Sequence, residues 1–175
     1  MRPPDPLIGP DRVAMSTPRV TVKLRRAGPA DLDAVDAIER SAFDRDRFAR
    51  RNLARMLKSP AAEFILAEEG GRPAGYALLL FRRGARVARL YSIAVAPESR
   101  GRGLSREIVQ AAVACAINRG CDRVRLEVRA ANARAIRLYE KSGFELLKEM
   151  SGYYPDGEAA FHMEKRIGAM TRAAS

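Results

Sequence analysis

Apolar and polar positions follow two periods along the chain, and the order of these periods predicts the order of the elements. Where apolar residues alternate with polar ones, or form short runs between Gly, Pro and Asp turns, the pattern is that of a β-strand. Seven segments show this pattern: residues 19–27, 62–69, 72–83, 86–95, 121–130, 144–154 and 158–167.

Helical spacing, with apolar residues three or four positions apart, predicts four further elements. We expect helices at residues 29–43, 47–58, 104–118 and 132–143. Pro29 suits the first turn of the first helix. In the last helix, Asn132 suits the N-cap and Gly143 suits the C-terminal end.

The lengths of the connections predict how the strands pair. Tight turns join the second, third and fourth strands, which favours an antiparallel meander. The unit from "YSIAV" through the third helix to "VRLEV" has the length of a right-handed crossover between parallel neighbours. We therefore expect an α/β (α+β) fold, with a central mixed, mostly antiparallel sheet of about seven strands flanked by about four helices.

The length of 175 residues fits one domain, which we place at residues 19–167. Residues 1–18 are rich in proline and show neither period, so we expect a disordered leader there, and a short tail at 168–175. The longest apolar run, Ala74–Phe81, is too short to span a bilayer, and no signal peptide is visible. We expect a soluble cytoplasmic protein without a membrane partner.

The formal charge of +11 comes mainly from arginine, since only five of the 32 cationic residues are lysine. A basic surface could attract nucleic acid, ribosomes or a phosphorylated cofactor. The arginines are spread along the whole chain and only 6% of residues are aromatic, which argues against a stacking platform for nucleic acid. Arginine on solvated surfaces explains most of the excess positive charge.

Cysteine and histidine are too few to predict a metal centre. Cys115 and Cys121 form no CxxC pair and are interpreted as buried thiols. The single histidine, His162, lies in the last predicted strand and is interpreted as a packing residue. No metal site is expected.

A glycine- and arginine-rich loop, "ESRGRGLSRE", joins the fourth strand to the third helix. A helix amino terminus presents free N–H groups and a partial positive charge, and glycines let the backbone approach a phosphate closely. The loop also follows the carboxyl end of a strand, where open α/β sheets bind ligands. We therefore expect an anion site at Arg100–Ser105.

Two segments carry a resemblance to a known family. "YSIAVAPESRGRGLS" resembles the acetyl-CoA signature of the GNAT N-acetyltransferases, with Arg100 and Gly103 matching and Ser105 in place of the usual glycine or alanine. "LEVRAANARAIRLYEKSGF" and "GYYPDGEAA" resemble the ribosomal-protein-alanine N-acetyltransferases of that family. The resemblance covers about residues 19–167 and implies the GNAT fold, with acetyl-CoA as the cosubstrate.

The resemblance also implies which residues contact the cofactor. The extended backbone of the fourth strand would bind the pantetheine amides, the glycine-rich loop the pyrophosphate, and Asn132 the pantetheine arm. The expected cofactor-binding residues are Ile93, Ala94, Val95, Arg100, Gly101, Arg102, Gly103, Leu104, Ser105, Arg106 and Asn132.

Glu127 and Tyr139 are the expected catalytic residues. The resemblance makes Glu127, the only carboxylate on its strand, the acceptor of the substrate's proton; the alternative is an ion pair with Arg125 or Arg129. It makes Tyr139 the donor of a proton to the departing CoA thiolate; the alternative is a core aromatic.

The acceptor is the least defined part of the site. Tyr153 and Tyr154 either line a peptide slot or cap a hairpin. The resemblance implies acetylation of a peptide or protein α-amine, such as the N-terminus of a ribosomal protein. The alternatives are acetylation of a small amine or amino-acid derivative, and a non-catalytic acetyl-CoA-binding or ribosome/RNA-associated module. We expect a monomer or a dimer.

Overall fold

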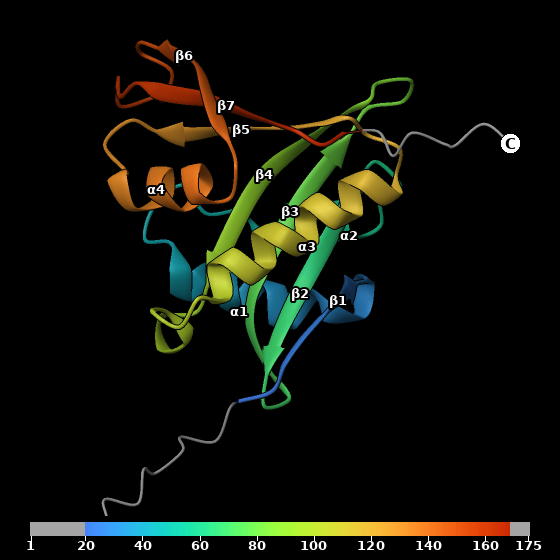
Figure 1. The fold of residues 1–175 in the computed structure, drawn as a ribbon. Helices are drawn as coiled ribbons and strands as arrows, with labels where there is room; N and C mark the ends of the chain where they lie inside the picture. The colour runs from blue at the N-terminus through green and yellow to red at the C-terminus, as the bar shows by residue number, and fades with distance from the viewer. Residues whose placement is uncertain (1–19, 169–175) are drawn as a thin grey trace, which may run out of the picture.

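The computed structural model describes residues 20–168. The predicted leader (1–18) and residues 169–175 of the predicted tail lie outside this range. Strands and helices follow one another in the predicted order (Figure 1). The strands are β1 Val22–Ala27, β2 Ala62–Glu69, β3 Arg72–Phe81, β4 Val87–Val95, β5 Arg123–Arg129, β6 Glu145–Met150 and β7 Ala160–Arg166. The helices are α1 Leu32–Ala42, α2 Arg50–Leu57, α3 Leu104–Asn118 and α4 Ala133–Lys141, with short 3-10 turns at Pro29–Asp31 and Pro97–Ser99.

All seven strands form one sheet in the order β1-β2-β3-β4-β5-β7-β6. Strands β2 to β4 form the predicted antiparallel meander, β1 adds to it antiparallel to β2, and β4 and β5 are the predicted parallel neighbours. The last hairpin joins the sheet through β7, which pairs with β5 on one side and β6 on the other. The prediction of a mixed, mostly antiparallel sheet is therefore confirmed.

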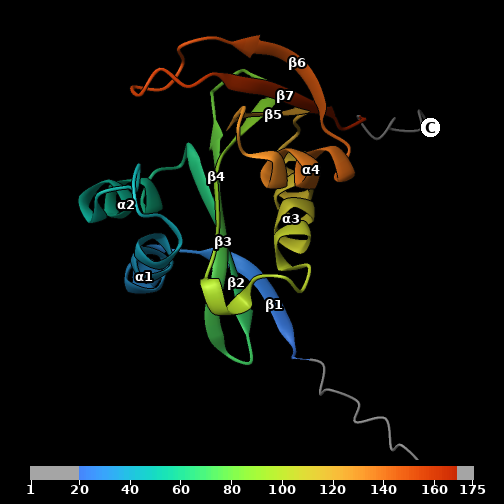
Figure 2. The same cartoon turned by 90° about the vertical axis from the view of Figure 1, so that its left-hand side faces the viewer.

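The helices cover the two faces of this sheet in pairs. Helices α1 and α2 lie on one face, and α3 and α4 lie on the other (Figure 2). Each face has its own apolar core, because successive strand residues point to opposite sides. The α1/α2 core includes Val35, Ile38, Leu53, Phe64, Leu66 and Leu78. The α3/α4 core includes Ile65, Leu79, Leu90, Ile108, Val124, Leu126 and Val128.

Most elements are a few residues shorter than predicted, among them α2 and β6. Helix α2 begins at Arg50 rather than near Arg47, because the backbone of Ala49 is still extended (ψ 140°), and the N–H of Phe48 just before it donates to the carboxylate of buried Glu39 (2.8 Å). Strand β6 ends at Met150, whereas the sequence pattern predicts that it continues to Tyr154. The "PDG" segment forms the predicted turn, with the N–H of Gly157 donating to the carbonyl of Tyr154 (2.8 Å).

Strands β4 and β5 diverge along their length. They pair at only three positions, from Val87↔Arg123 to Arg89↔Arg125, although β4 continues to Val95. Just beyond these pairs β4 contains a bulge, since Leu78 and Leu79 of β3 face Ser92 and Leu90 and leave Tyr91 as the extra residue. Past the bulge, the described residues supply no strand on the β5 side of β4, which opens the sheet there.

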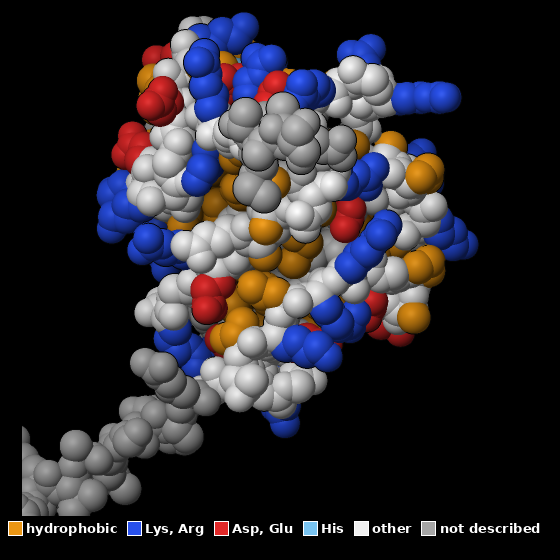
Figure 3. Space-filling view, turned by 45° about the vertical axis from the view of Figure 1, so that its right-hand side comes forward, with side chains coloured by type: hydrophobic (Ala, Val, Ile, Leu, Met, Phe, Trp, Pro, Cys, Tyr) orange, Lys and Arg blue, Asp and Glu red, His pale blue; other side chains and the backbone are white. Residues whose placement is uncertain are grey.

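Basic side chains are distributed over the surface. On the face in Figure 3 the Lys and Arg side chains surround an apolar centre and do not gather into one patch. Many of the arginines pair with carboxylates, as Arg25 does with Asp31 (2.7 Å) and Glu68 (3.0 Å). No helix within residues 20–168 combines the length and the apolar character that a membrane crossing requires.

Candidate active site

A cavity of about 380 Å³ lies where β4 diverges from β5. Its walls come from the end of α1, the end of β4, the glycine-rich loop with the start of α3, and helix α4. It is lined by Ala42, Phe43, Ile93, Ala94, Val95, Ser99, Arg100, Gly101, Gly103, Leu104, Ser105, Arg106, Asn132, Arg134, Ala135, Leu138 and Tyr139.

The glycine-rich loop shapes the part of the cavity beside α3. Gly101 (φ 81°) and Gly103 (φ 83°) both adopt the left-handed conformation, which glycine enters without steric cost. A Cβ at either position would meet no heavy atom of the described chain within 4 Å, so the backbone faces open space. Since Gly103 immediately precedes α3, the free N–H groups of the first helical turn follow directly.

The charge of the cavity suits an anion. Its lining includes three arginines, Arg100, Arg106 and Arg134, and no acidic residue among those that the structure describes. Two helices, α3 and α4, begin at this cavity, so both contribute positive ends of their dipoles. The cavity therefore fits a ligand with phosphate groups, as the residue pattern predicts.

The backbone of Ile93–Val95 forms another wall. On one side these residues pair with β3, at Ala77, Tyr76 and Gly75. On the other side they face the cavity, where β5 has moved away. Backbone groups at this edge can hydrogen-bond an extended ligand as a neighbouring strand would. The carbonyl of Val95 accepts from Nε of Arg100 (3.2 Å), which ties the loop to the strand.

Most of the predicted cofactor-binding residues line this cavity. The exception is Arg102, whose guanidinium points to the end of β2 and donates to the carboxylate of Glu69 (2.8 Å). Glu69 also accepts from the hydroxyl of Ser99 (3.0 Å), so this ion pair braces the loop from outside. Arg134 was not predicted, although its place in the first turn of α4, next to a predicted ligand, is a signal for an anion contact.

Helix α4 carries Asn132 and Tyr139 at the cavity. The side chain of Asn132 accepts from the N–H of Ala135 (3.1 Å) and so forms the predicted cap. Tyr139 is half-buried, and its ring meets that of Phe144 edge-on at 5.8 Å. Burial, with a smaller contribution from nearby Tyr154, raises the pKa of Tyr139 to about 12. The phenol therefore keeps its proton at neutral pH while it lines the cavity.

Glu127 lies outside the cavity, on the α1/α2 side of β5. Arg125, Glu127 and Arg129 alternate with the buried residues of that strand, as the sequence predicts. The ion pair of Glu127 is with Arg89 of β4: its Oε2 accepts from Nε and Nη2 of that residue, both at 3.0 Å. Its other oxygen lies 3.5 Å from Nδ1 of His162, directly across on β7.

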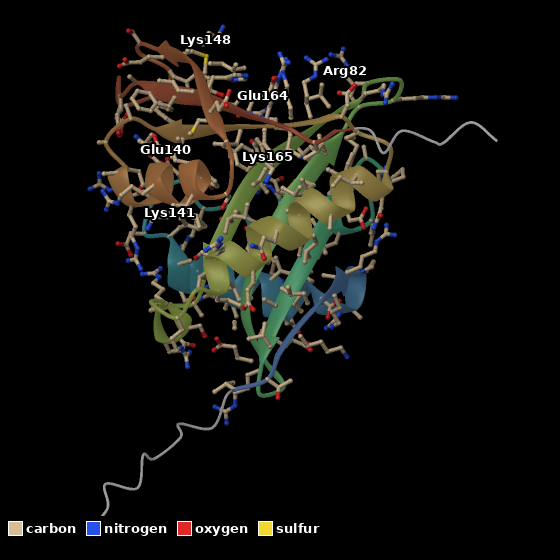
Figure 4. All side chains as sticks on the ribbon, viewed as in Figure 1. Arg82, Glu140, Lys141, Lys148, Glu164 and Lys165 are labelled. Carbon is tan, nitrogen blue, oxygen red and sulfur yellow. The ribbon has the colours of Figure 1, made fainter. Side chains whose placement is uncertain are left out.

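The two arginines suggested as alternative partners of Glu127 bind other carboxylates. Arg125 donates to Glu164 (2.6 Å). Glu164 and Lys165 leave β7 in opposite directions (Figure 4), and Lys165 reaches the carbonyl of Ser142 at the end of α4 (2.6 Å). Arg125 and Glu164 therefore lie on the same face of the sheet as Glu127, but they pair with each other.

Arg129 holds together the two loops beside Glu127. It pairs with Asp46 of the α1–α2 loop (2.6 Å) and with Glu158 of the β6–β7 loop (2.6 Å). Its guanidinium also lies 4.1 Å from the ring centroid of Tyr154. The neighbouring Tyr153 packs edge-on against Tyr154, with centroids 5.0 Å apart. The two predicted substrate-binding tyrosines therefore lie at this face rather than in the cavity.

Tyr154 interacts electrostatically both with Tyr139, which lines the cavity, and with Glu127. Its pKa is raised, mainly by burial, and Arg129 opposes this effect while Tyr153 and Glu127 add to it. Tyr154 in turn contributes to the raised pKa of Tyr139. Tyr154 therefore lies near enough to both Glu127 and Tyr139 to interact with them electrostatically.

Comparison with known proteins gives consistent relatives. Residues 32–144 match the model of the acetyltransferase (GNAT) family. An N-alpha-acetyltransferase of Sulfurisphaera tokodaii is 31% identical over 152 residues, 81% of this chain and 90% of that protein. The crystal structure of the ribosomal-protein-S18-alanine N-acetyltransferase from Escherichia coli superposes with a TM-score of 0.78 at 28% identity, covering 89% of this chain and 99% of that one.

A third relative is an acetyltransferase that is not named for peptide or protein acetylation. A mycothiol acetyltransferase of Thermobispora bispora is 34% identical over 136 residues, 70% of this chain but 46% of that protein.

Proposed function

The chain belongs to the acetyltransferase (GNAT) family, and on this premise we propose that it acetylates the α-amino group of a peptide or protein, as a ribosomal-protein-alanine N-acetyltransferase does. The observation that carries the proposal is the position of the cavity. The glycine-rich loop and Tyr139 line this one cavity, where β4 diverges from β5, and Glu127 lies on β5 outside it. Relatives named for α-amine acetylation support the choice of acceptor.

The residues of the cavity fit acetyl-CoA. N–H groups from Gly101 to Ser105 would hold the pyrophosphate, with Arg106 and Arg134 adding charge. The edge of β4 at Ile93–Val95 would hold the pantetheine arm. When bound, acetyl-CoA supplies an activated acetyl thioester. An N–H at this strand edge could then polarise the thioester carbonyl.

Two side chains would move the protons of the reaction. Glu127 accepts a proton from the substrate amine, directly or through a water, on the α1/α2 face. Tyr139 donates its phenolic proton to the thiolate that leaves. An α-amine asks less of the base than a lysine does, because its ordinary pKa is about 7.7–8.0 rather than about 10.4.

The mycothiol acetyltransferase among the relatives supports a second candidate, acetylation of a small-molecule amine. Both candidates use the same cavity and the same two catalytic residues. They differ in what occupies the face formed by Glu127, Tyr153 and Tyr154.

One experiment tests the proposal and separates the candidates. The protein is incubated with acetyl-CoA and a panel of N-terminal peptides, including ribosomal ones, together with amino acids and polyamines, and products are located by mass spectrometry. We expect acetylation at peptide α-amines. Turnover of a small amine alone would favour the second candidate, and no turnover with any member of the panel would contradict the proposal.

A further inference from the structure

The carboxylate of Glu127 is already engaged by a cation, Arg89. Nε and Nη2 of Arg89 both donate to Oε2 of Glu127 at 3.0 Å. The side chain of Glu127 is 16% exposed and that of Arg89 is 42% exposed, so the guanidinium is the partner nearer to solvent. An acceptor amine that approaches Glu127 from solvent therefore meets Arg89 as well.

Arg89 is held in this position by neighbouring rings. Its guanidinium lies 4.8 Å from the ring centroid of Tyr91, the bulged residue of β4. Tyr91 stacks in turn on Phe48 of the α1–α2 loop, with centroids 5.5 Å apart. On its other side, Nη2 of Arg89 donates to the hydroxyl of Tyr153 (3.5 Å). The ion pair is therefore fixed by packing, unlike most exposed ion pairs.

A carboxylate paired in this way attracts an arriving cation weakly, because the two charges largely cancel at short range. Amines that reach it in the neutral form are then favoured. At pH 7.5 roughly a quarter to two fifths of ordinary α-amines are neutral, against about 0.1% of lysine ε-amines. The difference corresponds to a preference on the order of 10²-fold for the weaker base.

Building on the function proposed above, we propose that Arg89 is a specificity-determining residue. By pairing with Glu127 it makes the site select the weakly basic α-amines of peptides and reject strongly basic amines such as lysine side chains and polyamines. Once Arg89 is removed, the bare carboxylate attracts ammonium groups directly, and strongly basic acceptors bind better.

Arg125 provides a matched control for Arg89. The two residues are register partners on β4 and β5, and the side chain of Arg125 is similarly exposed, at 37%. Arg125 pairs with Glu164 and not with Glu127. Its loss removes the same charge from the same face while leaving the carboxylate of Glu127 paired.

The test compares wild type, Arg89→Gln, Arg89→Lys and Arg125→Gln at pH 7.5 with acetyl-CoA. Two peptides of matched sequence serve as acceptors: one has a free α-amine and no lysine, and the other is blocked at its N-terminus and contains one lysine. We measure kcat/KM for each peptide, and thermal unfolding for each variant. Arg89→Met, which keeps the aliphatic stem against Tyr91, replaces Arg89→Gln if that variant does not fold.

We expect Arg89→Gln to reduce the preference for the α-amine at least about tenfold, mainly through a lower KM for the lysine peptide. Arg89→Lys and Arg125→Gln should keep the wild-type preference. An unchanged preference in Arg89→Gln, with the wild type active on the α-amine peptide, overturns this inference alone. A wild type that acetylates neither peptide overturns the proposed function and this inference with it.

Discussion

The cofactor cavity and the face around Glu127 differ in the kind of atoms that form them. The cavity is lined by the edge of β4, the glycine-rich loop and the first turns of α3 and α4, so it offers backbone groups as well as side chains to a ligand. The Glu127 face consists of charged and aromatic side chains held by ion pairs, such as those of Arg89 and Arg129. A backbone site depends on conformation, whereas a side-chain site depends on which residues the fold brings together.

This difference explains how one fold can keep a cofactor and vary its acceptor. Most side chains could change at the cavity without removing its N–H groups, whereas a single change at Arg89 alters the charge that an acceptor meets. We therefore expect substitutions on the Glu127 face to affect turnover and acceptor choice, and substitutions in the loop to affect CoA affinity. Four variants test this separation.

Glu127→Gln is expected to have the largest effect. It keeps the size of the side chain but removes the base, so turnover with an N-terminal peptide should fall roughly 10²–10⁴-fold. CoA affinity, measured by calorimetry, should stay within about twofold, because Glu127 lies outside the cavity. Raising the pH should restore part of the rate, since more of the amine is then neutral. Wild-type turnover at pH 7 would show that Glu127 is only the structural partner of Arg89.

Tyr139→Phe should slow turnover by about 10²-fold, because the leaving thiolate loses its proton donor. In contrast to Glu127→Gln, a higher pH should give no rescue. Burial raises the pKa of Tyr139 to about 12, so the wild-type phenol itself should stay protonated through pH 9. A pH–rate profile of both variants makes the comparison, and equal rescue of the two would contradict their separate roles.

Gly103→Asp should weaken CoA binding at least about tenfold, or roughly 1.4 kcal/mol. The carboxylate would stand where the phosphates are expected, at the amino end of α3. Gly103→Asn is the matched control, because asparagine has a similar shape, tolerates a positive φ and carries no charge. Calorimetry should show that the asparagine variant binds better than the aspartate variant. Equal affinity of both with the wild type would contradict the phosphate cradle.

Arg134→Ala should have the smallest effect, a loss of CoA affinity of about fivefold, or about 1 kcal/mol. Arg134 lines the cavity and is exposed, so water and salt screen its charge. The loss should shrink as salt is raised. Arg137→Ala, on the same helix but outside the cavity lining, should bind CoA like the wild type. A larger loss in Arg137→Ala than in Arg134→Ala would place the phosphates elsewhere on α4.

Local signals were sufficient to predict most of the fold and the glycine-rich loop, whereas the other cofactor-binding residues were implied by the family resemblance. The helix Leu104–Asn118 and the alternation of β5 follow from hydrophobic period alone. The ends of helices and strands were harder to predict. Before α2, for example, the N–H of Phe48 donates to Glu39, nine residues earlier. The buried thiol predicted at Cys121 is found, while Cys115 is only half-buried. The Glu39–Phe48 hydrogen bond lies outside a short window of sequence, whereas Arg134 could have been predicted from its place in the first turn of α4.

The order of the elements, the glycine-rich loop before α3 and the cap of α4 could all be predicted from the residue pattern, because they depend on residues a few positions apart. The partner of Glu127 could not, because it depends on how distant segments pack. Arg125 and Arg129 are its neighbours in sequence, yet Arg89, 38 residues away, forms the pair. The parallel register of β4 and β5 brings Arg89 beside that face, and two carboxylates from distant segments, Glu164 and Asp46, engage the arginines that lay closer along the chain.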